Sequence, residues 1–104
     1  MQEKIFFTYI ATNKRDTVLY TGVTSDIYQR MDQHKKKVIR GFTEKYNVGK
    51  LVFCEAFSTP LDAIAAEKRI KGWTRAKKIK LIEEKNPEWK DLLDVERDSS
   101  LRSE

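Results

Sequence analysis

The sequence has few of the residues that could tie a small protein together covalently or through a metal cluster. It contains one cysteine, Cys54, and one histidine, His34. A single cysteine excludes an internal disulfide and a multi-cysteine zinc site, and a single histidine excludes a two-histidine metal motif. Because Cys54 lies in an apolar run, we expect it to be a buried structural thiol.

Long apolar segments are also missing. The two longest uncharged runs, Ile5–Asn13 and Thr17–Ser25, are far shorter than the roughly twenty residues of a transmembrane helix. The early Glu3 argues against a secretion signal. With 39% hydrophobic residues the chain is too apolar to be disordered, and with 36% charged residues it is too polar for a membrane protein. We expect a soluble, cytoplasmic, single-domain protein without a membrane partner.

Positive charge is concentrated in two blocks of the chain, whose overall net charge is +5. Residues 28–50 hold seven basic and two acidic side chains, and residues 65–82 hold seven and one. Residues 83–104 reverse the balance, with four basic and eight acidic side chains. Clustered lysine and arginine are typical of domains that bind a polyanion. A solvated surface would give the same runs, so charge alone leaves both interpretations open.

The first quarter of the chain predicts a β-hairpin. Ile5–Thr12 and Thr17–Val23 are rich in aromatic and β-branched residues, and the polar Asn13–Asp16 separates them. If this loop has four residues, Tyr9 faces Tyr20 directly on one sheet face, with the Cβ atoms about 5 Å apart. A five-residue loop would place them on opposite faces, because side chains alternate along a strand. We predict the four-residue loop.

An amphipathic helix is predicted next, over residues 26–37, with Ser25 as its N-cap. Its apolar face repeats at steps of four, three and four residues. The residues on this face are Ile27, Met31, His34 and Val38.

The second half predicts one strand and two helices. Lys50–Ala56 is an apolar strand, and a helix follows to about Lys71, with Thr59 as N-cap and Pro60 at its first position. Thr74 then caps a helix that ends near residue 85. The order ββαβαα is of the α+β class. We expect residues 1–93 to form the domain and the polar residues 94–104 a flexible tail.

Three ionisable residues lie on the stripes expected to pack inward. Arg30 and His34 lean toward the apolar face of the first helix, and Glu67 lies between Ile64 and Ile70 on the second. A snorkelling side chain or a structural ion pair would explain any one of them. Together with two tyrosines, all directed at one sheet face, they favour a functional site.

This set of side chains suits phosphodiester hydrolysis. An arginine can hold a phosphate with its planar fork, and a single glutamate suits Mg²⁺, which keeps several waters and also binds substrate phosphate. A tyrosine or histidine can position or deprotonate an attacking water. The metal stabilises charge on the phosphate and leaving-group oxygens.

In this order and spacing the residues resemble the GIY-YIG nuclease family. Phe7–Tyr9 corresponds to its first motif and Tyr20–Gly22 to its second. Arg30 and His34 resemble the arginine and histidine of the following helix, and Glu67 resembles the metal-binding glutamate. The sequence departs from the motifs in its first position, where a phenylalanine replaces glycine, and in both middle positions, where threonines replace isoleucines.

The resemblance spans about residues 3–92 and is strongest to the small single-domain members, through segments such as LYTGVTSDIYQRMDQHK and RIKGWTRAKKIKLIEEKNPEWKDL. It implies a three-stranded antiparallel sheet flanked by helices. It also implies cleavage of DNA that depends on Mg²⁺ or Mn²⁺.

The resemblance assigns a role to each site residue. Tyr9 activates or positions the water, and Tyr20 orders that network and the phosphate. Arg30 stabilises the developing charge, His34 assists proton transfer, and Glu67 binds the metal.

Several other residues are candidates with a supporting role. Gly22 would leave room beside the second tyrosine, and Phe7 would share the sheet face of Tyr9 and narrow the site. Asn86 corresponds loosely to a late asparagine of the family, and Tyr46 could reach the site from a basic stretch. The residues expected to contact backbone phosphates are Lys35, Lys36, Lys37, Lys68, Arg75, Lys77 and Lys78.

The sequence therefore predicts an endonuclease of DNA repair or processing, acting on branched, damaged or single-stranded DNA. RNA is the alternative substrate, and a protein partner could target the enzyme. Two other interpretations stay open: a nucleic-acid-binding module with weak or no catalysis, and a subunit that a partner chain completes.

Overall fold

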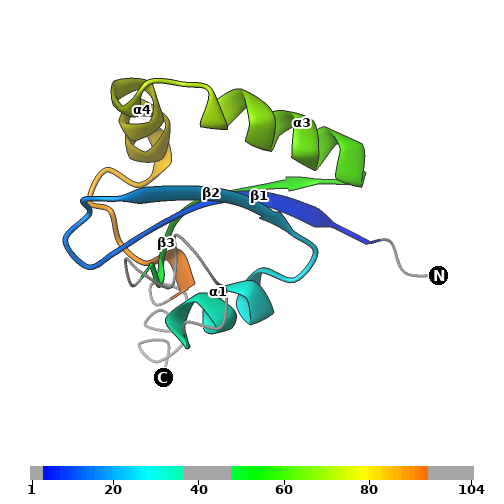
Figure 1. The fold of residues 1–104 in the computed structure, drawn as a ribbon, viewed down its shortest axis with the longest axis horizontal. Helices are drawn as coiled ribbons and strands as arrows, with labels where there is room; N and C mark the ends of the chain where they lie inside the picture. Colours follow the sequence, from blue (N-terminus) through cyan, green and yellow to red (C-terminus); the bar gives the residue numbers. More distant parts are fainter. Residues whose placement is uncertain (1–3, 37–47, 94–104) are drawn as a thin grey trace.

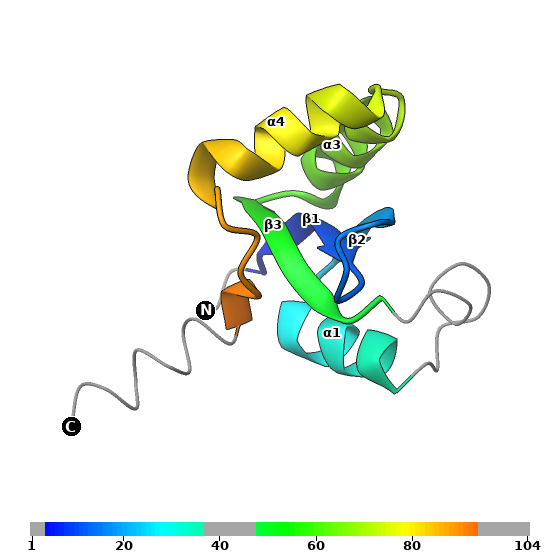
Figure 2. The ribbon, with the colours of Figure 1, turned by 90° about the vertical axis from the view of Figure 1, so that its left-hand side faces the viewer.

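The protein is an α+β domain built on a three-stranded antiparallel sheet, as the sequence predicts. In this computed structural model, residues 4–36 and 48–93 are described. The strand order is β2-β1-β3. Helix α1 covers one face of the sheet, and α3 and α4 cover the other (Figure 1 and Figure 2). The elements are β1 (Phe6–Thr12), β2 (Leu19–Thr24), α1 (Ile27–Lys35), β3 (Lys50–Phe57), α3 (Pro60–Lys71) and α4 (Arg75–Lys85).

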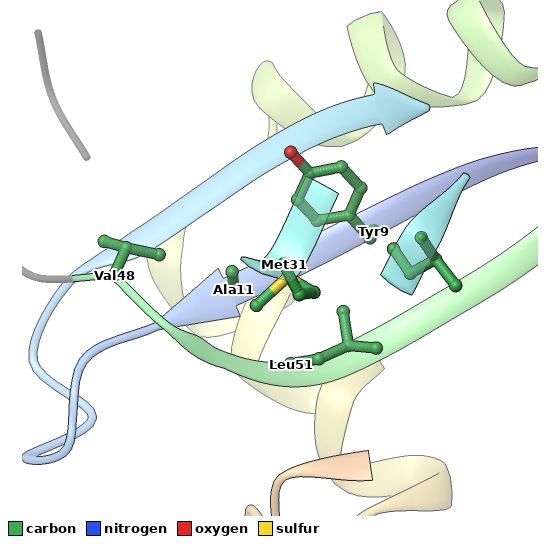
Figure 3. Close-up of a cluster of buried hydrophobic side chains, with 6 residues drawn as sticks. Tyr9, Ala11, Met31, Val48 and Leu51 are labelled. Carbon is green, nitrogen blue, oxygen red and sulfur yellow. The ribbon is translucent and has the colours of Figure 1, made fainter. Parts of the chain in front are cut away.

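The central strand β1 sends alternate side chains to two separate cores. Tyr9 and Ala11 belong to the cluster beneath α1, whereas Ile10 belongs to the cluster beneath α3 and α4. The buried residues on the α1 side are Tyr9, Ala11, Ile27, Met31, Val48 and Leu51 (Figure 3). Those on the other side are Ile10, Val52, Phe53, Ile70 and Ile82, with Trp73 and Trp89 packed against them.

The hairpin differs from its predicted register. The connection between β1 and β2 is six residues long, Asn13–Val18, and Tyr9 pairs with Gly22 while Tyr20 pairs with Ala11. The prediction that Tyr9 and Tyr20 face each other directly is therefore wrong. Because the shift amounts to two residues, both tyrosines keep the same sheet face and lie diagonally across the two strands.

The longer loop has a local cause. The Asn13 side chain accepts a hydrogen bond from the Thr17 backbone N–H at 2.8 Å and donates to the Thr17 hydroxyl at 2.7 Å. Asp16 adopts a φ of 58° within this turn, a conformation that asparagine and aspartate tolerate better than most residues. These bonds hold Thr17 in the turn, so β2 begins two residues later than expected.

The start of α1 also differs from the prediction. The N-cap is Asp26, whose carboxylate accepts a hydrogen bond from the Gln29 backbone N–H at 3.0 Å, and Ser25 lies outside the cap. Ile27, Met31 and His34 are buried as the apolar pattern predicts. The helix ends earlier than residue 37, and both Lys37 and Val38 lie outside the described residues.

The caps of the last two helices agree with the prediction. The hydroxyl of Thr59 accepts a hydrogen bond from the Asp62 backbone N–H, and that of Thr74 accepts one from Lys77, both at 3.2 Å. These side chains satisfy backbone donors that have no partner in the first helical turn. Across residues 4–36 and 48–93, no helix combines the length and apolar character that crossing a membrane requires. The predicted tail, 94–104, lies outside the described residues, and the boundary at 93 stays a prediction.

Candidate active site

The Tyr9 side chain lies across the neighbouring strand at Gly22. A Cβ atom at Gly22 would come within 2.6 Å of the Tyr9 hydroxyl oxygen and 2.8 Å of its Cζ. Tyr9 is 1% exposed, so its ring has no free space to move into. Figure 3 shows the hydroxyl directed toward β2 and away from Leu51. Gly22 therefore leaves room two residues along β2 from Tyr20, and the Tyr9 ring occupies this room.

His34 approaches the same hydroxyl from the last turn of α1. Its Nε2 lies 2.9 Å from the Tyr9 Oη, and the two rings meet edge to face with centroids 5.8 Å apart. The Tyr20 ring lies 5.2 Å from His34 and 6.2 Å from Tyr9, measured between centroids. Three aromatic side chains from β1, β2 and α1 thus form one cluster.

Burial sets the protonation of this cluster. It lowers the pKa of His34 to about 4, with a further contribution from the positive charge of Arg30, so the imidazole is neutral near pH 7. Burial also raises the pKa of Tyr9, and Tyr20 and Glu67 raise it further, whereas Arg30 lowers it. The phenol is therefore protonated at neutral pH, and a positive charge nearby favours its ionisation.

Arg30 and Glu67 act on Tyr9 from two different layers of the fold. Arg30 projects from α1, on the face of the sheet that carries Tyr9, whereas Glu67 belongs to α3 on the opposite face. The expectation that the whole set lies on one sheet face is wrong for Glu67. Both charges still influence the pKa of the Tyr9 phenol, which lies at the edge strand β2 rather than beneath the middle of the sheet.

Glu67 is the carboxylate available to a metal ion near the cluster. Its side chain is 18% exposed, and its Oε2 lies 2.8 Å from the Nζ of Lys71, one helical turn further along. Within residues 4–36 and 48–93, no three His, Cys, Asp or Glu side chains gather into a metal site made of protein ligands alone. One carboxylate suits Mg²⁺ or Mn²⁺ in a nuclease, because water and substrate phosphate supply the remaining oxygen ligands.

The residues expected to contact phosphate are distributed over several surfaces. Lys35, Lys36 and Lys68 are exposed, and Lys36 pairs with Asp32 at 3.0 Å. On α4, the ammonium group of Lys77 lies 4.8 Å from the centre of the Trp73 ring. Arg75 and Lys78 lie together beside the β1–β2 loop. Lys37 and Tyr46 lie outside the described residues.

Asn86 is engaged in the packing of the C-terminal segment. Its amide nitrogen donates to the carbonyls of Val52 and Lys90, at 3.2 and 2.8 Å, and its amide oxygen accepts from the Lys90 N–H at 3.0 Å. These bonds attach it to β3, the strand on the far side of β1 from β2. The structure therefore does not bring Asn86 to the tyrosine cluster.

Two residues that the sequence analysis did not single out support Glu67. The Thr8 hydroxyl donates to the Ala63 carbonyl at 2.7 Å and so fixes α3 to β1 one turn before Glu67. Lys71 is the ion-pair partner described above. The spacing of Glu67 and Lys71 could have indicated the pair, because residues four apart meet on a helix surface. The Thr8 bond joins distant parts of the chain and left no sequence signal.

Cys54 is half-buried, and burial raises the pKa of its thiol to about 11, so it is protonated at neutral pH. The expectation that Cys54 is buried is therefore wrong. Cys54 pairs with Tyr9 across β1 and β3 and packs against the core beneath α1, which supports a structural role.

The fold and the cluster together define a small α+β domain in which two tyrosines come from β1 and β2, an arginine and a histidine from α1, and a glutamate from α3. The GIY-YIG catalytic domain matches residues 5–80. The chain belongs to the GIY-YIG family.

Individual relatives cover most of this chain. The UPF0213 protein YazA of Bacillus subtilis is 35% identical over 85 residues, which is 82% of this chain and 85% of YazA. A UPF0213 protein of Staphylococcus aureus is 34% identical over 79 residues, or 76% of this chain and 95% of its own. The solution NMR structure of the UPF0213 protein BH0048 from Bacillus halodurans aligns with a TM-score of 0.54 and 26% identity. That alignment covers 85% of this chain and 93% of BH0048.

Proposed function

We propose that this protein is a divalent-metal-dependent endonuclease that hydrolyses phosphodiester bonds in DNA. The main support is the 2.9 Å contact between Tyr9 Oη and His34 Nε2, at a phenol whose pKa also responds to Arg30 and Glu67. These are the residue types that a buried proton transfer next to a phosphate requires. Membership of the GIY-YIG family supports the same activity.

The neutral His34 donates its Nε2 proton to the Tyr9 oxygen. In the other tautomer the proton would sit on Nδ1, which is buried and has no hydrogen-bond partner among the described residues. A buried N–H group without a hydrogen-bond partner is rarer in proteins than a buried acceptor atom without one. With His34 as donor, the Nε2–H bond stabilises the phenolate that forms when Tyr9 releases its proton to solvent. This phenolate then accepts a proton from the attacking water.

Arg30 and Tyr20 act on the phosphate side of the cluster. The guanidinium of Arg30 lowers the pKa of the Tyr9 phenol, and its fork can bind the non-bridging oxygens of a phosphate while negative charge develops. Tyr20, on the same sheet face, orients the phosphate and the attacking water. The Arg30 charge thus serves both the phenolate and the transition state.

Glu67 would hold the metal through its single carboxylate. A bound Mg²⁺ or Mn²⁺ supplies positive charge that stabilises the leaving oxygen and favours ionisation of Tyr9. The ammonium group of Lys71 contacts the Oε2 atom of this carboxylate at 2.8 Å. Binding of a cation at Glu67 therefore competes with this ion pair.

The substrate proposal follows from the basic side chains. Lysine and arginine on exposed helices contact backbone phosphates and carry no base-specific information. We therefore expect structure-selective or non-specific cleavage, in DNA repair or processing in the cytoplasm, with a protein partner supplying any sequence targeting.

The test is cleavage of plasmid and single-stranded DNA with Mg²⁺ or Mn²⁺. We expect Glu67→Ala and Arg30→Ala to abolish nicking while circular dichroism shows an unchanged fold. Arg30→Lys keeps the charge but loses the fork, so it should retain only part of the activity. Glu84→Ala, an exposed acidic residue of α4, is the matched control and should cleave normally.

The outcomes separate the alternatives. Nicking that persists in Glu67→Ala would contradict the metal assignment. DNA binding without cleavage in any divalent metal would favour the nucleic-acid-binding module. The structural reason to consider this module is Phe7, which replaces the motif glycine and packs against the same core as Tyr9. Cleavage that appears only when a second chain is added would favour the partner-completed subunit.

A further inference from the structure

A basic hollow lies at the junction of the β1–β2 loop and the start of α4. It has a volume of about 300 Å³ and is lined by Thr17, Val18, Leu19, Arg75 and Lys78. This volume is at the small end of ligand-binding pockets. Two of its five lining residues are cationic and none is acidic. The catalytic cluster contributes no residue to it.

The two cations of the hollow are held in place by the fold. Arg75 and Lys78 are three residues apart on α4 and so project from the same side of the helix. The Nη2 of Arg75 donates to the Asp16 carbonyl at 3.4 Å, which ties the guanidinium to the loop. Lys78 is half-buried. Within residues 4–36 and 48–93, neither cation forms an ion pair, so both charges are available to an anion.

The loop that forms the other wall is preorganised as well. Its one acidic side chain, Asp16, is already neutralised by Lys50 at 2.8 Å. The Thr17 hydroxyl accepts a hydrogen bond from the Asn13 amide at 2.7 Å, which leaves its own hydrogen free to donate. A positively charged, hydroxyl-lined hollow that needs little reorganisation suits a phosphate group.

The hollow and the tyrosine cluster are connected by the edge strand β2, although α4 covers the sheet face opposite the tyrosine rings. Leu19, in its lining, immediately precedes Tyr20 on the edge strand β2, and Gly22, beneath the Tyr9 ring, is three residues further. At about 3.3 Å per residue this separation is roughly 10 Å along the strand. Because adjacent phosphates of one strand lie closer together than this, a phosphate that reaches the hollow would be more than one nucleotide away from the scissile phosphate.

We propose that the Arg75–Lys78 hollow binds a backbone phosphate of the DNA strand that is cleaved, at a position away from the scissile phosphate. The proposal rests on the endonuclease function proposed above and adds a substrate-positioning site to it. Arg75 and Lys78 hold the strand, and Tyr9 and His34 are left to act on the scissile phosphate.

The first test is DNA binding without metal, which prevents cleavage. The affinity of a fluorescein-labelled single-stranded oligonucleotide is measured in EDTA by fluorescence anisotropy across a salt series. One phosphate contact contributes a slope of about 0.7 in log affinity against log salt, equivalent to about fourfold in Kd at 0.15 M salt. We expect Arg75→Ala and Lys78→Ala each to weaken binding by about this factor and to flatten the salt dependence accordingly.

The matched control is Lys80→Ala, on the same helix. Lys80 lies at a separate hollow that includes Glu83 and Glu84, so removing its charge should leave both Kd and salt slope unchanged. If Arg75→Ala and Lys78→Ala behave like Lys80→Ala, the proposal is wrong. In cleavage assays the hollow variants should raise KM and leave kcat near the wild-type value, because they touch no reacting atom.

The outcomes distinguish this proposal from the endonuclease function. If the wild type cleaves DNA but Arg75→Ala and Lys78→Ala bind it as tightly as the wild type, the phosphate-binding role of the hollow is wrong and the endonuclease function stands. DNA binding that weakens in these variants, without cleavage by the wild type, would overturn hydrolysis alone. A third outcome is that the protein binds no oligonucleotide while inorganic phosphate shifts the amide resonances of Thr17 to Leu19. That result would show a simple anion site and overturn both the hollow's role in DNA binding and the endonuclease function.

Discussion

At the scale of single residues, the contact between Gly22 and Tyr9 is the most restrictive in the site. A methyl group at Gly22 would stand 2.6 Å from the Tyr9 hydroxyl oxygen. We expect Gly22→Ala to displace the phenol from His34, to abolish cleavage and to lower the free energy of unfolding by about 1–3 kcal/mol, as overpacking does.

Urea unfolding and the plasmid assay measure these two effects. Gly72→Ala is the control, because its added Cβ would meet only the Arg69 and Lys68 carbonyl oxygens, at 3.6 and 3.8 Å. Full activity in Gly22→Ala would show that the Tyr9 position is not needed for catalysis.

His34 makes stability depend on pH. An unfolded His34 takes up a proton below its usual pKa of 6.5, whereas the folded residue, with a pKa of about 4, stays neutral. The unfolded state therefore binds more protons between these values, and the free energy of unfolding falls as the pH drops from 6.5 to 4, by up to roughly 3 kcal/mol.

The variant His34→Gln tests this. Its amide can still donate to Tyr9 but does not titrate, so stability should fall less steeply than in the wild type over this pH range. Carboxylates titrate in both proteins and cancel in the comparison. Parallel pH profiles from chemical unfolding would contradict a neutral buried His34.

At the scale of elements, one hydroxyl connects β1 to the helix that carries Glu67. Replacing Thr8 with valine removes its bond to the Ala63 carbonyl at nearly constant volume. We expect Thr8→Val to lower the free energy of unfolding by about 1 kcal/mol. Because α3 would lose its attachment near Glu67, the affinity for Mn²⁺, measured by paramagnetic broadening of amide resonances, should also fall.

Thr12→Val is the matched control for this change. Thr12 is a buried threonine on the same face of β1, and its hydroxyl donates to the Val18 carbonyl in the hairpin loop. It should lose comparable stability and keep the wild-type Mn²⁺ affinity. Equal Mn²⁺ affinity in both variants would mean that the Thr8 bond serves stability alone.

The helix starts show which local features a sequence can reveal. Thr59 and Thr74 were predictable as caps because each is the polar residue next to a helix-forming segment and bonds to its own first turn. At α1 the adjacent Ser25 and Asp26 can both act as N-caps. The Thr24 hydroxyl accepts a hydrogen bond from the Asp26 backbone N–H at 3.0 Å, which holds Asp26 in the extended conformation of an N-cap.

At the scale of the whole molecule, the expected domain boundary after residue 93 can be tested by truncation. The Asp91 carboxylate accepts hydrogen bonds from the backbone N–H groups of Leu51 and Leu93, at 3.3 and 3.2 Å. A chain that ends at Leu93 retains both bonds. We expect its melting temperature to stay within a few degrees of that of the full chain and its DNA cleavage to be unchanged.

Thermal unfolding and the plasmid assay would check this, with a chain that ends at Lys90 as the comparison. That chain loses Asp91 and the partly buried Leu92 and Leu93, which pack against the core beneath α1, and should melt markedly lower. Equal stability of these two shortened chains would place the boundary earlier than predicted.

Local patterns in the sequence were sufficient to predict the ββαβαα order, the family, and the sheet face shared by Tyr9 and Tyr20. These depend on local periodicity, capping and the alternation of side chains, which tolerate a two-residue error in register. Tertiary structure alone decided that Tyr9 lies over Gly22 and that Glu67 belongs to the opposite layer. It also made His34 neutral and built the hollow at Arg75, because burial and contacts between distant segments exist only once the chain has folded.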